Sequence, residues 1–198
     1  MEENLLPIFE GSRIGLFGGS FNPAHEWHYQ VSNRALIKFK LDKVIWLVSP
    51  NNPLKEIHNL MGYDERLKSA QKQARSLDFF VSDFEKKIQS EYSIDTVRKI
   101  MELHPKTKFI WIMGSDCAAE IEKWREWKNF LETLPIAIYP RPSFTADSGK
   151  LRIIKEFCKN IDDLENFDII QEKPPCITFI PGPMSDISST TIRESKID

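Results

Sequence analysis

The stretch GLFGGSFNPAHEWH, residues 15–28, combines closely spaced glycines with two histidines three residues apart. Gly18 and Gly19 carry no side chain, so the backbone is expected to turn tightly there and present its N–H groups to an anion. His25 and His28, at the start of a helix, are expected to project from one face toward that turn. The pattern predicts a phosphate site, although its spacing matches neither the Rossmann nor the Walker glycine motif. The alternatives are a turn without a ligand and, for His28, a satisfied core position.

Further cationic and hydroxyl groups follow other expected strands. They are Lys55 after SPNNP, Arg141 after IAIYP, and Ser189, Thr190 and Arg193 in ISSTTIRES. Each of them alone is typical of ordinary surface. Because loops at one edge of a parallel sheet converge on one cleft, their shared position after strands predicts a common anion site. Ser188 or Ser189 is expected to cap a helix whose N–H groups, hydroxyls and arginine face that anion.

The elements that must position these residues alternate between strand and helix. Apolar runs predict strands at 13–17 and 43–49, joined by a helix over 23–40 with Asn22 as its cap and Pro23 in its first turn. The alternation continues with helices expected at 64–77, 93–103, 124–131, 150–160 and 188–195, and strands at 79–82, 108–113, 135–139 and 176–180. This order predicts an α/β fold: one doubly wound domain, residues 1–198, with a mostly parallel sheet flanked by helices.

Composition limits the class of protein. A chain of 198 residues with 41% hydrophobic and 28% charged residues is typical of one globular domain without a membrane span. The formal net charge of -2 gives no general attraction to nucleic acid or acidic lipid, so an anion site must be built locally. Cys117, Cys158 and Cys176 show no metal-ligand spacing, and we expect neither a disulfide framework nor a protein-held metal. The opening residues MEENLLPIFEGSR lack a secretory pattern, which favours a cytoplasmic location.

Residues near the strand at 108–113 allow two interpretations each. Asp116 could accept hydrogen bonds from a ribose or cap the next helix. Trp124 and Trp127 are three residues apart; aromatic residues are in general more often packed core than a platform for a ligand, although one of these two could stack on a flat ring.

Taken together, these motifs resemble those of the bacterial nicotinate-nucleotide adenylyltransferases, within the nucleotidyltransferase superfamily marked by [H/T]-x-G-H. The matching segments run in the same order from Arg13 to Arg193: GLFGGSFNPAHEWH, LVSPNNPLK, EYSIDTVRKI, WIMGSDCAAEIEKWREW, YPRP and ISSTTIR. The resemblance implies a Rossmann-like fold that transfers AMP from ATP to nicotinate mononucleotide, giving nicotinate adenine dinucleotide and pyrophosphate on the route to NAD. It also implies that there is no covalent enzyme intermediate and that Mg²⁺ accompanies ATP.

The resemblance further implies a role for each candidate residue. Those expected to hold the ATP phosphates are His25, His28, Lys55 and Arg193. Those expected to form the rest of the ATP site are Gly18, Gly19, Ser20, Phe21, Asp116, Ser189 and Thr190. Nicotinate mononucleotide is expected to meet the backbone amides of Ser93 and Arg125, the ring of Trp124 and the side chain of Arg141.

One residue departs from the family motif: Trp27 stands where the family has glycine between its histidines. On a helix, residue 27 points away from the face of the two histidines and joins Val31, Ala35 and Phe39, so we expect the indole to pack into the core. The alternative is that glycine is needed for the close approach of a phosphate, in which case activity falls.

Two other functions stay open at this point. The first is a related adenylyltransferase that uses nicotinamide mononucleotide or phosphopantetheine as acceptor. The second is a nucleotide-binding module that binds ATP but has lost catalysis through Trp27. In each case we expect small-molecule partners rather than nucleic acid or membranes. A homo-oligomer is compatible with the sequence without being specified by it.

Overall fold

The structure, a computed structural model, describes residues 6–51, 60–142, 144, 149–160, 168–183, 185, 187 and 189–194. These residues form one seven-stranded sheet in the order β3-β2-β1-β4-β5-β7-β6, with parallel pairing throughout. The strands are β1 (Arg13–Gly19), β2 (Lys43–Val48), β3 (Phe79–Ser82), β4 (Lys108–Gly114), β5 (Ile136–Tyr139), β6 (Lys159–Asn160) and β7 (Cys176–Phe179). The expected α/β fold with a parallel sheet is confirmed.

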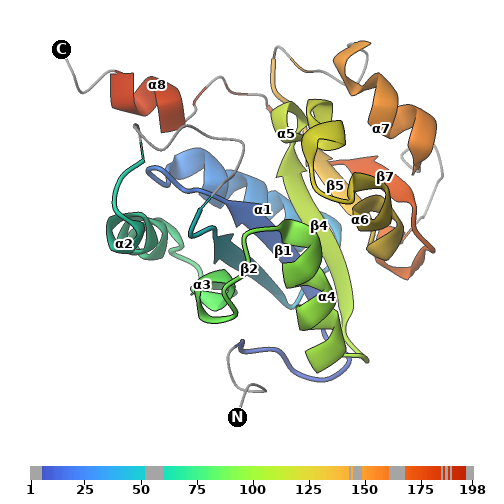
Figure 1. Cartoon of the computed structure of the whole chain (residues 1–198), viewed down its shortest axis with the longest axis horizontal. Helices are drawn as coiled ribbons and strands as arrows, with labels where there is room; N and C mark the ends of the chain where they lie inside the picture. The colour runs from blue at the N-terminus through green and yellow to red at the C-terminus, as the bar shows by residue number, and fades with distance from the viewer. Residues whose placement is uncertain are drawn as a thin grey trace.

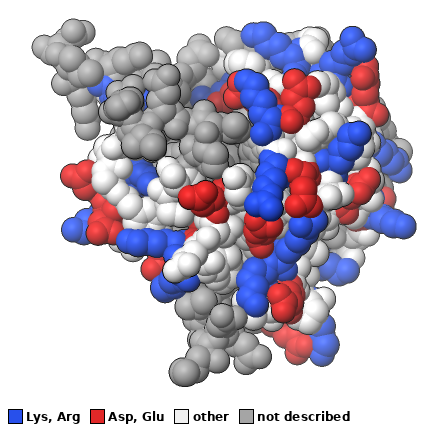
Figure 2. Space-filling model, viewed as in Figure 1, with Lys and Arg blue, Asp and Glu red and all other residues white. Residues whose placement is uncertain are grey.

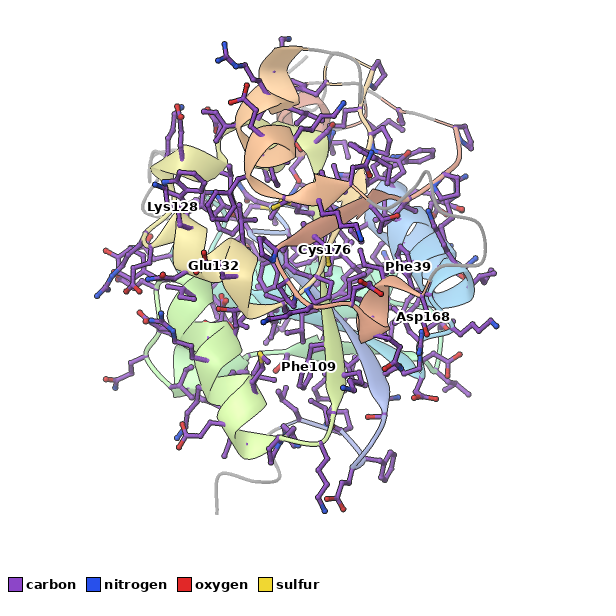
Figure 3. All side chains as sticks on the ribbon, turned by 90° about the vertical axis from the view of Figure 1, so that its right-hand side faces the viewer. Phe39, Phe109, Lys128, Glu132, Asp168 and Cys176 are labelled. Atoms are coloured by element: carbon purple, nitrogen blue, oxygen red, sulfur yellow. The ribbon has the colours of Figure 1, made fainter. Side chains whose placement is uncertain are left out.

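Helices cover both faces of this sheet (Figure 1). The α-helices are α1 (Glu26–Lys38), α2 (Tyr63–Gln73), α3 (Phe84–Lys87), α4 (Ser93–Leu103), α5 (Ser115–Ala119), α6 (Trp127–Thr133), α7 (Arg152–Phe157) and α8 (Ser189–Glu194). One core cluster joins the sheet to α1 and α2, and the other joins it to α3, α4, α6 and α7. The edge view shows the two layers, with Phe39 after α1 on one side and Lys128 and Glu132 of α6 on the other (Figure 3).

The strand sequences are apolar along their length because both faces of the sheet are covered. In β2 the run VIWLV is buried, and in β4 the run FIWIM is buried. Continuous apolar runs of this kind are typical of parallel strands between two helical layers. This is why the order of elements could be predicted from the local pattern of apolar residues.

The junction between β1 and α1 differs from the expectation. Gly18 and Gly19 end the strand, pairing in register with Leu47 and Val48, and do not form a tight turn. The backbone takes the left-handed conformation two residues later, at Phe21, with φ of 47°.

The start of α1 also differs from the expectation. The helix begins at Glu26 after the cis peptide bond between Asn22 and Pro23, with His25 as its N-cap. Asn22 is not the cap, because its Oδ1 accepts a hydrogen bond of 2.9 Å from the N–H of Met61.

Other element boundaries differ for local reasons. The helix expected at 124–131 begins at Trp127, because Glu126 takes a left-handed conformation with φ of 49°. The helix expected at 150–160 ends at Phe157, and Lys159 instead pairs with Cys176 in the sheet. The helix expected at 64–77 ends at Gln73, and the short helices α3 and α5 were not expected.

The surface mixes charges of both signs. Lysine and arginine side chains lie beside aspartate and glutamate side chains across the face shown in Figure 2. This mixture agrees with the formal net charge of -2. Among the described residues, no helix is both long and apolar enough to cross a membrane.

Gly18 is explained by packing rather than by a turn. A Cβ placed on Gly18 would lie 2.5 Å from two ring carbons of Trp111, which is closer than side-chain atoms approach one another. The neighbouring strand β4 therefore brings an indole against the backbone of β1 at this position. Glycine is required here by a close approach between two strands.

We predict that Gly18→Ala lowers the free energy of unfolding by about 1–3 kcal/mol, because the added methyl group overpacks the core against Trp111. Urea unfolding followed by circular dichroism would measure the loss. Gly149→Ala is the control, because a Cβ there meets no heavy atom within 4 Å. Equal stability of the two variants would contradict this account.

Candidate active site

The order of strands reverses between β1 and β4. From β1 the chain proceeds to β2 and β3 on one side of the sheet, and from β4 it proceeds to β5 and β7 on the other. In open parallel sheets, ligands bind at the carboxyl ends of the strands at such a reversal. In this structure those ends are Gly19 and Gly114.

The two histidines lie side by side after β1. Their ring centroids are 3.9 Å apart, and Nδ1 of His28 accepts a hydrogen bond of 3.1 Å from the backbone N–H of His25. Because Nδ1 of His28 acts as an acceptor, the proton of the neutral ring belongs on Nε2. In its neutral form, His28 is therefore expected to donate from Nε2.

Aromatic rings hold His28 in place. The centroid of its ring lies 4.9 Å from that of Phe21, 5.8 Å from Phe17 and 6.0 Å from Trp46. Phe21 in turn stacks on Trp46, with an angle of 4° between the ring planes. The packing interpretation of His28 is thus partly correct, since one edge of the ring is held by protein while the side chain is only partly buried.

His25 is buried, at 7% exposure, and its Nδ1 has no hydrogen-bond partner among the described residues. Oγ of Ser20 is likewise buried without a partner in that part of the chain. Buried polar atoms are nearly always hydrogen-bonded, so two unpaired ones in the same loop between β1 and α1 indicate a place for a polar ligand. Burial, helped by the nearby charge of Arg141, lowers the pKa of His25 to about 4. The imidazole is therefore neutral at neutral pH.

The C-terminal helix α8 contacts the loop between β1 and α1. Oγ of Ser189 donates to the carbonyl oxygen of Pro23 at 2.9 Å, and Nη1 of Arg193 donates to the carbonyl oxygen of Asn22 at 2.5 Å. Asn22 precedes His25 by three residues, so the structure places Arg193 against the same loop as His25. Ser189 is the first residue of α8 rather than its cap.

Three of the expected groups cannot be placed. Lys55 and Ser188 lie outside the described residues, as does the side chain of Thr190.

Asp116 and Arg141 form an ion pair, and the charge of Arg141 is near enough to lower the pKa of His25. Oδ1 of Asp116 lies 3.2 Å from Nε of Arg141. The backbone N–H of Arg141 donates to Oγ of Ser115 at 2.9 Å, and its Nη1 donates to the carbonyl oxygen of Ile187 at 3.1 Å. The interpretation of Asp116 as a helix cap is wrong, because Gly114 is the N-cap of α5 and no side chain caps that helix.

A second group of candidates lies at the start of α4. Ser93 is the first residue of α4, so its N–H is among those without a partner inside the helix. The guanidinium of Arg125 lies 4.6 Å from the ring centroid of Tyr92 and 3.6 Å from Oδ2 of Asp95. An open depression of about 710 Å³ is lined by these three side chains together with Lys87, Ile88, Gln89, Ser90, Glu91 and Lys99.

Trp124 belongs mainly to the core. Its ring is edge-on to Trp111 at 6.4 Å and lies 5.3 Å from Phe130. It is partly buried, and the stacking of its ring on a ligand stays a prediction. Trp127 packs edge-on against Phe157 at 5.3 Å. The core interpretation of both indoles agrees with these contacts.

Trp27 packs as its place on α1 predicts. The indole is partly buried against the core cluster of α1, edge-on to Tyr139 at 5.7 Å and with the guanidinium of Arg34 at 5.5 Å from its centroid. It therefore points away from the two histidines and toward the end of β5.

Sequence reasoning missed Arg66, which lies on α2. It is 2% exposed, and together with Ala70 it forms the buried face of the helix. The sequence held only a partial signal, the place of Arg66 one turn before Ala70 on the expected helix, because its carbonyl partners come from segments distant in the chain.

Comparison with known proteins gives consistent results. The chain matches the cytidylyltransferase-like family over residues 16–195. It is 38% identical over 187 residues to a protein of Parvibaculum lavamentivorans named "Probable nicotinate-nucleotide adenylyltransferase", covering 93% of this chain and 92% of that protein. A protein of the same name from a Caulobacter species is 39% identical over 182 residues, covering 91% of this chain and 96% of its own length.

Solved structures share the fold. The nicotinic acid mononucleotide adenylyltransferase of Plasmodium falciparum, complexed with NaAD, is similar with a TM-score of 0.71 and 21% identity, covering 92% of this chain and 83% of that one. The same enzyme complexed with APC gives a TM-score of 0.69.

We predict that His25 makes the protein less stable in mild acid. Its pKa of about 4 lies below the ordinary value of 6.5, so between these pH values the unfolded chain binds more protons and the free energy of unfolding falls as pH falls. The loss reaches up to about 3 kcal/mol. His25→Gln should remove it, as measured by urea unfolding from pH 8 to pH 4.5. A stability difference between the two proteins that stays constant over that range would contradict the assignment.

Proposed function

Because the chain belongs to the cytidylyltransferase-like family and, within it, to the nicotinate-nucleotide adenylyltransferases, we propose that it transfers AMP from ATP to nicotinate mononucleotide. The products are nicotinate adenine dinucleotide and pyrophosphate. The observation that carries the proposal is the placement of two adjacent imidazoles, an unpaired buried hydroxyl and Arg193 around one loop at the strand reversal.

The reaction needs positioning and charge neutralisation more than it needs a base. The phosphate of the mononucleotide is already ionised near neutral pH, so its oxygen attacks the α-phosphorus of ATP in line while pyrophosphate leaves. No proton has to be removed from the nucleophile. The described residues supply donors suited to this task, among them Nε2 of His28 and the guanidinium of Arg193.

His25 fits a phosphate ligand in its neutral form. A neutral imidazole donates one N–H and leaves room for a second donor, such as Oγ of Ser20, on the same anion. The negative charge of a triphosphate opposes the burial that lowers the pKa of His25, so binding should raise that pKa. The ring would then gain positive charge when ATP is present.

Mg²⁺ fits best as part of the ATP complex. Among the described residues, no group of three or more His, Cys, Asp or Glu side chains could hold a metal ion. Mg²⁺ is commonly held by phosphate oxygens with few protein ligands, and it would neutralise charge on the departing pyrophosphate. Asp116 is a carboxylate two residues after the end of β4, and it is paired with Arg141.

The start of α4 suits the acceptor. A nicotinate carboxylate needs donors, and the backbone N–H groups of Ser93, at the helix N-terminus, and of Arg125 are the donors we assign to it. A neutral carboxamide gains less from the same groups. We therefore propose nicotinate mononucleotide rather than nicotinamide mononucleotide or phosphopantetheine as acceptor. The cytoplasmic location and the homo-oligomer stay predictions.

Pyrophosphate release from ATP and Mg²⁺ with each acceptor tests the proposal. We expect release with nicotinate mononucleotide and at least tenfold less with nicotinamide mononucleotide or phosphopantetheine. His28→Ala should lower the rate by about 10²–10³-fold, because it removes a donor that acts on the phosphates. His104→Ala, after the far end of α4, should leave the rate unchanged. The proposal would be contradicted if none of the acceptors supported pyrophosphate release, or if His28→Ala kept the full rate.

Trp27→Gly tests whether the indole weakens catalysis. We expect the variant to lose about 3–5 kcal/mol of unfolding free energy, because it removes a packed indole and puts glycine in a helix. It should gain no activity. Trp27→Phe keeps a ring against Tyr139 and should stay close to the parent protein in rate. A rate that rises tenfold in the glycine variant, without loss of stability, would favour the catalytically weakened homologue instead.

A further inference from the structure

The guanidinium of Arg66 joins two connections at the carboxyl edge of the sheet, the loop after β1 and the segment between β2 and α2. Nη1 donates to the carbonyl oxygens of Ser20 and Ser49, both at 2.7 Å. Nη2 donates to the carbonyl oxygen of Pro50 at 3.0 Å, and Nε donates to that of Met61 at 3.2 Å. Ser20 follows β1, Ser49 and Pro50 follow β2, and Met61 precedes α2. One side chain thus fixes the ends of two adjacent strands.

Within the described residues, every hydrogen-bond acceptor of this guanidinium is a backbone carbonyl. Arg66 is 2% exposed, and burial lowers its pKa without discharging it, because arginine stays protonated in proteins. Carbonyl dipoles satisfy the N–H groups but leave a full positive charge. This charge lies directly behind the loop that carries the unpaired hydroxyl of Ser20. It raises the local affinity for an anion.

The bond to Ser20 also orients the next peptide. In a trans peptide the C=O and the following N–H point in opposite directions. Because the carbonyl of Ser20 points toward Arg66, the N–H of Phe21 points away from it. The left-handed conformation of Phe21 then turns the chain toward the histidines.

A chain of hydrogen bonds links Arg66 to Arg193. Arg66 holds the carbonyl of Met61, and the N–H of Met61 donates to Oδ1 of Asn22 at 2.9 Å. The carbonyl of Asn22 accepts the bond from Arg193. The loop between β1 and α1 is therefore fixed from both sides by arginines.

We propose that Arg66 is a positioning residue for the polyphosphate of ATP. It sets the Ser20 and Phe21 backbone so that the N–H of Phe21 and Oγ of Ser20 meet the phosphates, and it supplies an unneutralised positive charge behind them. The inference rests on the proposed function only in that ATP is the ligand.

Binding of an unreactive ATP analogue, α,β-methylene ATP, and of adenosine tests the proposal by calorimetry. Arg66→Lys keeps the charge but loses the planar fork that holds several carbonyls, and Arg66→Gln loses both. We expect the affinity for the analogue to fall about tenfold in Arg66→Lys and further in Arg66→Gln, with the affinity for adenosine within about twofold of the parent protein. If Arg66 had only a structural role, the variants would lose affinity for the analogue and for adenosine to the same extent.

Arg13→Lys is the matched control. Arg13 also donates to backbone carbonyls, those of Phe39 and Lys40, but it lies at the opposite end of β1 and is neutralised by Asp168. Figure 3 shows Asp168 close to Phe39 at that end. This variant should lose stability and keep its affinity for the analogue. An equal loss of affinity for the analogue in Arg13→Lys and Arg66→Lys would overturn the proposal.

A second measurement needs no variant. In the ¹⁵N spectrum of the parent protein, the amide of Phe21 should shift on addition of α,β-methylene ATP and stay in place with adenosine. An unshifted Phe21 amide at saturation overturns the proposal. Neither measurement involves turnover, so a protein that binds the analogue but releases no pyrophosphate would disprove the proposed function while leaving the role of Arg66 supported.

Discussion

The chain leaves β1 toward one edge of the sheet and leaves β4 toward the other, although the two strands are neighbours. The connections that follow these strands therefore diverge, and the carboxyl ends of β1 and β4 have no crossover above them. Everything proposed for the site depends on this geometry. At this edge, Asp116 follows β4 and pairs with Arg141, which follows β5. The C-terminal helix α8 returns to the loop between β1 and α1, which carries His25.

The charges around this reversal explain why the site suits an anion. His25 is kept neutral by burial, and Arg141 is balanced by Asp116. Arg66 is instead bound to backbone carbonyls, which satisfy its N–H groups without cancelling its charge, and Arg193 adds a second guanidinium at the same loop. A polyphosphate would provide negative charge, accept a hydrogen bond from Ser20, and reduce the cost of burying the charge of Arg66.

The sequence predicted the alternation of elements well because that signal is local. Buried parallel strands are apolar along their whole length, and the helix at 93–103 and the strand at 79–82 have the expected bounds. The role of Gly18 could not be predicted, because the indole that excludes a side chain there comes from β4, more than 90 residues later. The cap of α1 was missed for the same reason: the side-chain oxygen of Asn22, the expected cap, instead accepts a hydrogen bond from the backbone N–H of Met61.

The site was predicted as a set of residue types more than as a set of contacts. Histidines three residues apart indicated a pair, and the structure brings their rings together. Spacing could not show that Asp116 pairs with Arg141, or that Arg66 joins two strand ends, because both contacts depend on the tertiary fold. The binding roles assigned to Ser93, Trp124 and the other candidates stay predictions.

The central claim is that one polyphosphate meets both imidazoles at the strand reversal. Its most direct test is the ¹⁵N resonances of His25 and His28 in protein labelled at histidine, followed during titration with ATP and Mg²⁺ and, separately, with adenosine. The account predicts that the side-chain nitrogens of both residues shift with ATP, that the pKa of His25 rises above 4, and that adenosine causes neither change. Imidazole resonances that stay unchanged at saturating ATP would contradict it.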